Sequence, residues 1–209
     1  MKKRSCLLAL SLLLLALAAC GGQDEPMSEK PVLYLYPEEE TLVSVRLDLD
    51  GGLTSSYPAY GDGWTVLADP EGTLTDPESG REYYCLFWEG TAGTEYDFST
   101  GYCVAGEETA SFLEGALAAL GLTQREANEF LIYWLPRMEG NPYNLISFQT
   151  GAYTDAARLT IDPAPDTLIR VFMAWKGLEE PVEVAPQGLT APERTGFTVV
   201  EWGGAEVIG

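Results

Sequence analysis

Two predicted strands end in a tryptophan and a glutamate beside glycine, within the stretches 87–90 and 201–204. Two carboxylates that flank a glycosidic bond can hydrolyse it, because one protonates the leaving oxygen while the other acts as nucleophile or base. An indole face beside them can stack on a sugar ring. The candidates are therefore Glu89 and Glu201 for catalysis, and Trp88 and Trp202 for ligand binding.

The same residues have a second interpretation that requires no ligand. Aromatic side chains at strand ends fill the rim of a hydrophobic core, and glutamates there discourage pairing between sheet edges. Because 32 residues of the chain are Asp or Glu, two glutamates in similar settings are expected without any catalytic role. We therefore expect a non-catalytic binding or structural domain with an unknown ligand. The alternative is a carboxylate-dependent glycan-active enzyme or a carbohydrate-binding module.

The residues that several other catalytic mechanisms require are absent from the chain. The chain has no histidine, which excludes Ser-His-Asp and Cys-His catalysis and zinc bound through histidine. No phosphate-binding glycine motif is present. The stretch 48–52 resembles half of a calcium loop, but its alternating acids stop after two, so we interpret it as a β-turn. We predict no metal ion and no cofactor.

The first twenty residues have the pattern of a targeting signal. A basic start, an apolar run from Leu7 to Leu15 and small residues before Cys20 describe a secretory signal. The run Leu-Ala-Ala-Cys resembles a bacterial lipobox, which implies cleavage after residue 19 and lipid attachment to Cys20. We expect an extracytoplasmic, cell-envelope lipoprotein whose partner is the membrane through this anchor.

The charge of the chain restricts its other partners. The leader 1–19 holds three of the twelve basic residues and none of the acidic ones, so the mature chain is more acidic than the formal net charge of −20. Such a charge repels nucleic acid and anionic lipid headgroups. The expected partner is therefore an unknown protein or glycan, and no nucleic acid.

Two cysteines remain after processing, because Cys6 leaves with the leader and Cys20 takes the lipid. Cys85 and Cys103 both fall in predicted strands. In an oxidising compartment two such thiols pair, so we predict a disulfide between them. The alternative is a pair of free thiols.

The chain divides into three parts: the leader 1–19, an acidic tether 20–30 and one domain over 31–209. Residues 43–50 alternate between apolar and polar, which indicates a strand with one solvated face. Further strands are predicted in both halves of the chain, over 64–67, 73–75, 82–89, 102–104, 145–149, 158–161, 168–175 and 197–202, with an edge strand at 182–184.

The middle of the chain is predicted to form a helical hairpin. Apolar residues recur at helical spacing from Phe112 to Leu120, and Gly121 stands where a helix C-terminus requires it. Thr123 and Glu126 form a capping box for a second helix, which we expect to end at Pro136. Strands before and after a helical hairpin predict an α+β fold, a mainly antiparallel sheet or sandwich with the hairpin packed on one face.

The domain resembles an uncharacterised family of bacterial secreted proteins and lipoproteins. The resemblance rests on Lys30–Pro37, Asn141–Asn144, Arg170–Lys176 and Thr190–Gly204, and it covers nearly all of the mature chain. It brings no activity, ligand or catalytic residue. Arg170 and Arg194 stand out in a chain with few cations, and Arg170 interrupts an apolar strand. For both we expect a structural ion pair with a carboxylate rather than recognition of an anion.

Overall fold

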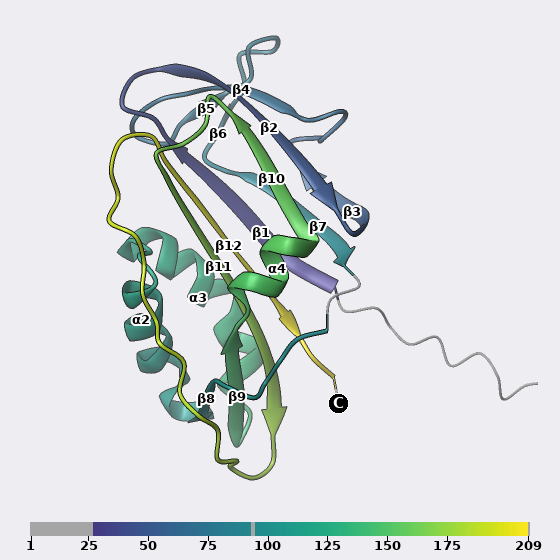
Figure 1. Ribbon diagram of the computed structural model, residues 1–209, viewed down its shortest axis with the longest axis vertical. Coiled ribbons are helices and arrows are strands. Elements are labelled where there is room, and N and C mark those ends of the chain that lie inside the picture. The colour runs from purple at the N-terminus through teal and green to yellow at the C-terminus, as the bar shows by residue number, and fades with distance from the viewer. Residues whose placement is uncertain (1–26, 93–94, 209) are drawn as a thin grey trace, which may run out of the picture.

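The computed structural model describes residues 27–92 and 95–208, and shows three layers (Figure 1). A helical hairpin covers one face of a seven-stranded sheet, and a five-stranded sheet covers the other. Most strand pairs are antiparallel. The predicted α+β class, with a mainly antiparallel sandwich and a helical hairpin on one face, is confirmed. The leader, Cys20 and most of the tether lie outside the described residues.

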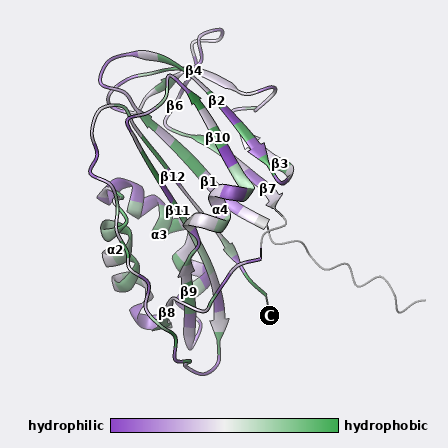
Figure 2. Cartoon of the chain, viewed as in Figure 1, coloured by the Kyte–Doolittle hydropathy of each residue, from purple (hydrophilic) through white to green (hydrophobic). Residues whose placement is uncertain are grey.

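The large sheet has the strand order β3-β7-β1-β12-β11-β9-β8. Its central strands are buried on both faces, and Figure 2 shows hydrophobic residues along much of β11. These two strands are parallel, with Arg170 opposite Glu201 in the register. The strands of this sheet are β1 (Met27–Tyr36), β3 (Gly51–Tyr57), β7 (Leu86–Ala92), β8 (Tyr102–Ala105), β9 (Tyr143–Phe148), β11 (Thr167–Leu178) and β12 (Thr198–Glu206).

The small sheet has the order β10-β2-β4-β5-β6. Val43 and Val45 of β2 are buried against the large sheet, as the alternation in the sequence predicts. β2 and β3 are joined by a single residue yet belong to different sheets, which links the two layers at one end. The strands are β2 (Thr41–Leu49), β4 (Trp64–Ala68), β5 (Leu74–Thr75), β6 (Glu82–Tyr83) and β10 (Ala157–Asp162).

The hairpin consists of α2 (Thr109–Ala119), preceded by the 3-10 turn η1 (Gly106–Glu108), and α3 (Gln124–Met138). The capping box between Thr123 and Glu126 is present, and Gly121 has the positive φ that a helix C-terminus requires. The predicted end at Pro136 is wrong, because α3 continues to Met138. Proline removes only the hydrogen bond to the carbonyl of Ile132, and that residue is exposed to water.

Four further features differ from the sequence predictions. β1 begins at Met27, so the last four residues of the predicted tether 20–30 belong to a strand, and Ser28 is fully buried. The single strand predicted over 82–89 is split between β6 and β7, which lie in different sheets. The short helix α4 (Thr150–Ala156) has no apolar periodicity and was not predicted. Residues 182–184 form no strand in the structure.

Candidate functional site

Glu89 and Glu201 lie on opposite faces of the large sheet. Glu89 shares its face of β7 with Phe87, which packs against the core under the helical hairpin. Glu201 accepts a hydrogen bond from Nε1 of Trp88, whose ring belongs to the core between the two sheets. A catalytic pair must face one substrate from a single cleft. The two glutamates therefore cannot act as such a pair in this fold.

Glu201 is part of a buried ion pair instead. Its Oε2 accepts a hydrogen bond of 2.7 Å from Nε of Arg170, and both side chains are almost fully buried. The Arg170 guanidinium also stacks on the ring of Tyr153, 4.7 Å from its centroid. Burial disfavours the charge on Arg170, but the Glu201 carboxylate and the Tyr153 hydroxyl together outweigh burial and raise the pKa of the guanidinium. The structural ion pair predicted for Arg170 is confirmed.

The predicted ligand-binding tryptophans are core residues. Trp88 is 1% exposed and Trp202 is not exposed at all. Trp202 packs under the helical hairpin, whereas Trp88 packs between the sheets, so the two rings lie on opposite sides of the large sheet. A sugar ring needs an open aromatic face to stack on. The prediction that Trp88 and Trp202 bind a ligand is therefore corrected: both rings fill the interior.

The disulfide predicted between Cys85 and Cys103 is not formed. Both thiols are free. Cys85 immediately precedes β7 and Cys103 lies on β8, five strand intervals away in the sheet, which is roughly 24 Å. A disulfide requires Cα atoms within about 7 Å of each other. Burial, with a smaller effect of the nearby Glu129 carboxylate, raises the pKa of the Cys85 thiol to about 11, so that thiol is unreactive at neutral pH.

The second predicted arginine ion pair is confirmed, and it holds a long irregular segment of the chain in place. Nη2 of Arg194 contacts Oε2 of Glu126 at 2.5 Å and the carbonyl of Gly121 at 2.7 Å. The Glu126 carboxylate also accepts the N–H of the N-cap residue Thr123, so one carboxylate joins the start of α3 to the segment 179–197. The segment is thereby fastened at its C-terminal end against the hairpin.

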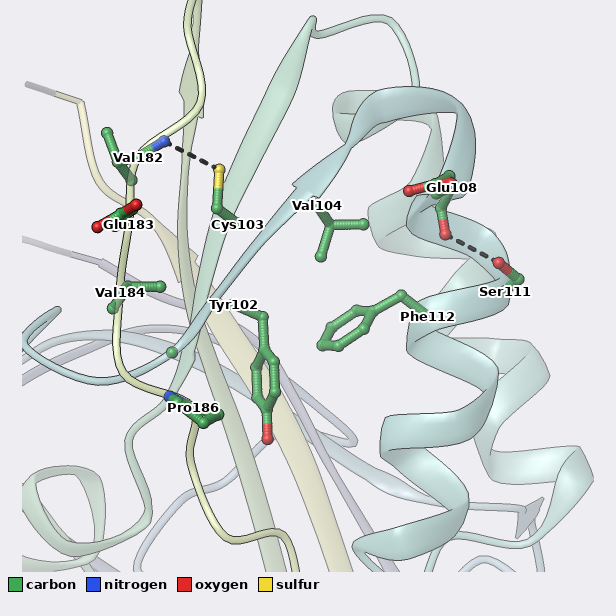
Figure 3. Close-up of a pocket in the computed structure, with 11 residues that line it drawn as sticks. Tyr102, Cys103, Val104, Glu108, Ser111, Phe112, Val182, Glu183, Val184 and Pro186 are labelled. Atoms are coloured by element: carbon green, nitrogen blue, oxygen red, sulfur yellow. Dashed lines mark hydrogen bonds between the residues drawn. The ribbon is translucent and has the colours of Figure 1, made fainter.

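An open groove runs beside β8, which is one of the two edge strands of the large sheet (Figure 3). Its cavity volume is about 730 Å³, within the range of ligand-binding clefts. β8 lies between its two walls, the first turns of α2 on one side and the extended residues 182–186 on the other. Figure 3 shows Val104 and Phe112 pointing toward each other on the helix side, and the Phe112 ring lies 4.9 Å from the Tyr102 ring.

The edge of β8 is only partly covered by the segment beside it. The N–H of Gly101 donates to the carbonyl of Ala185 at 2.8 Å, next to a single bridge between Thr100 and Ala185. Farther along, the N–H of Val182 donates to the sulfur of Cys103 at 3.4 Å rather than to a backbone carbonyl. The segment thus makes a single backbone bridge beside β8 and then diverges from the strand. The groove lies where no further backbone pairing with β8 is formed.

Within 27–92 and 95–208, no three residues among Cys, Asp and Glu are grouped as ligands for a metal ion. No helix in these ranges has the length and hydropathy of a membrane span.

Comparison with known proteins identifies a relative without an assigned activity. A protein of Butyrivibrio fibrisolvens, described as an uncharacterized protein in the bglA 3' region, is 38% identical over 87 residues. These cover 39% of this chain and 88% of that protein. The chain belongs to the family of this uncharacterised bacterial protein. No family model matches the chain, and no solved structure matches it.

Cys103 lines the groove, and the other candidate site residues chosen from the sequence, among those described, do not. One signal was visible in the sequence. Pro181, Pro186 and Pro192 mark a long extended excursion after β11, and such a segment must run along the surface. The sequence did not reveal that this excursion passes the edge of β8.

Proposed function

We propose that this protein is a lipid-anchored protein of the bacterial cell envelope whose domain binds a protein partner in the groove beside β8. The domain itself is non-catalytic. The observation that carries the binding role is the groove, which combines an apolar aromatic wall, a sheet edge and an open side. The lipobox-like run ending at Cys20 carries the anchor, and the resemblance to secreted proteins agrees with it.

The enzyme alternative has no geometric support in the described residues. Its two carboxylates are separated by the large sheet, and Glu201 is held by Arg170 away from solvent. A general acid or nucleophile must reach its substrate. Glu201 therefore stabilises the sandwich, and Glu89 is a partly exposed residue on the face that the helices cover.

The anchor is tested by metabolic labelling with radioactive palmitate in a bacterial host. We expect the wild-type chain to be labelled and Cys20→Ala to remain unlabelled with its leader uncleaved, because the lipidated thiol is absent. Cys6→Ala removes the other cysteine of the first twenty residues and should be labelled like the wild type. Labelling of Cys20→Ala at the wild-type level would contradict the anchor.

The binding role is tested by filling the groove. Peptides are first selected from a random displayed library for binding to the detergent-solubilised full-length protein. We expect these peptides to bind the Ser111→Trp variant at least about tenfold more weakly than the wild type, because the added indole on the exposed face of α2 occupies the groove. Ala118→Trp is the matched control. It adds the same ring about 10 Å farther along α2, outside the groove lining, and should bind within about twofold of the wild type. Equal binding by wild type and Ser111→Trp would contradict the role of the groove, provided both variants keep the wild-type thermal midpoint.

A further inference from the structure

We propose that the partner segment is a basic, extended peptide that pairs with β8 as an added strand. This inference rests on the proposed binding function and specifies its partner. Three observations carry it: the unpaired backbone of β8, the apolar wall beside that backbone, and the acidic groups at the groove.

The backbone of β8 offers one side to a new strand. All four residues of β8 are in antiparallel register with β9, but Gly101, just before the strand, directs its N–H away from β9 to Ala185. Because successive residues of a strand alternate in direction, Cys103 directs its N–H and C=O outward as well. Within the described part of the chain, the N–H of Val182 reaches only the sulfur of Cys103, and no backbone group outside the sheet bonds to the N–H or C=O of Cys103. Backbone donors and acceptors at an open edge are the groups that strand addition uses.

The walls of the groove suit an extended chain. Val104 and Phe112 lie on the helix side of β8, and Val182 and Val184 lie on the opposite wall. A strand placed between these walls directs its side chains alternately toward one wall and the other. Apolar side chains of the peptide therefore find partners on both sides. The volume of about 730 Å³ and the open side leave room for a short segment without displacing core residues.

The charges at the groove select a cationic peptide. Glu108 and Glu183 are exposed groove-lining residues on opposite walls, and none of the residues that line the groove is Lys or Arg. The chain as a whole has a formal net charge of −20, so the field that surrounds the groove has the same sign. An acidic peptide would be repelled, and a basic one is attracted both during encounter and when bound.

The experiment compares three fluorescein-labelled hexapeptides by fluorescence anisotropy on the detergent-solubilised full-length protein. The first alternates lysine and valine, the second alternates glutamate and valine, and the third repeats the first with every backbone nitrogen methylated. We expect the lysine peptide to bind at least about tenfold more tightly than either of the others, because only it combines the matching charge with backbone donors. Raising the salt concentration should weaken its binding.

Two double variants isolate the contribution of charge. The double variant Glu108→Gln with Glu183→Gln should bind the lysine peptide about tenfold more weakly than the wild type, since two exposed charge pairs are lost. Glu71→Gln with Glu78→Gln removes the same total charge from exposed positions that do not line the groove, and should change the affinity by no more than about twofold.

The outcomes separate this inference from the function on which it rests. If the glutamate or methylated peptide binds as well as the lysine peptide, and Ser111→Trp still abolishes binding, the groove is a binding site but the inference of a basic added strand is overturned. If the peptides bind Ser111→Trp as well as the wild type, the groove itself is not the site. Sedimentation that shows a dimer abolished by Ser111→Trp, without peptide binding, would assign the groove to a second copy of the chain and overturn the inference.

Discussion

Arg170→Met is expected to lower the free energy of unfolding by about 3–5 kcal/mol, since it leaves the carboxylate of Glu201 buried without its partner. Glu201 has no exposed surface, and its remaining hydrogen bond comes from the indole of Trp88. Water cannot replace the guanidinium there. The loss is measured by urea denaturation followed through tryptophan fluorescence.

The double variant Arg170→Met with Glu201→Gln supplies the control for this prediction. It removes both charges, so the penalty of an unpaired buried charge disappears and most of the lost stability should return. Arg158→Met is a second control, because Arg158 pairs with Asp48 on the surface. This substitution should lower the free energy of unfolding by at most about 1 kcal/mol. A loss below about 1 kcal/mol for Arg170→Met would contradict the buried pair.

Trp134→Ala is expected to lower the free energy of unfolding by about 3–5 kcal/mol, because it opens a cavity between α3 and the large sheet. The indole is fully buried and makes an edge contact with the ring of Trp175, with centroids 6.5 Å apart. Gly204 accommodates it, since a Cβ at this position would lie 2.6 Å from the ring. Thermal and urea denaturation give the magnitude.

Ile132→Ala is the matched control on the same helix. Ile132 is 76% exposed, so its truncation should change stability by no more than about 0.5 kcal/mol. If Trp134→Ala were equally mild, the apolar stripe of α3 would not be packed on the sheet, and the arrangement of the layers would be wrong.

The elements that local sequence signals determine could be predicted. The capping box of Thr123 and Glu126 satisfies backbone groups within four residues, so it is readable without knowledge of the fold. The alternation in β2 likewise reports one buried face directly. These signals sufficed for the class of the fold and for the packing of the hairpin on a sheet.

The relations between strands could not be predicted, and every error about the site follows from this. Glu89 and Glu201 both end apolar stretches, but the face to which each points depends on the register of strands far apart in the sequence. The separation of Cys85 from Cys103 depends on strand order, which local patterns do not contain. The groove likewise exists because the segment 182–186, far along the chain from β8, passes its edge.

Hydrogen exchange of the Cys103 amide tests the central claim, that the groove beside β8 is the binding site, most directly. In the free protein this N–H points outward from the sheet edge and should exchange readily. Saturation with the lysine–valine peptide should slow its exchange at least about tenfold while the amides of β4, in the other sheet, stay unchanged. Saturated binding that leaves the Cys103 amide exchanging at its free rate would contradict the account.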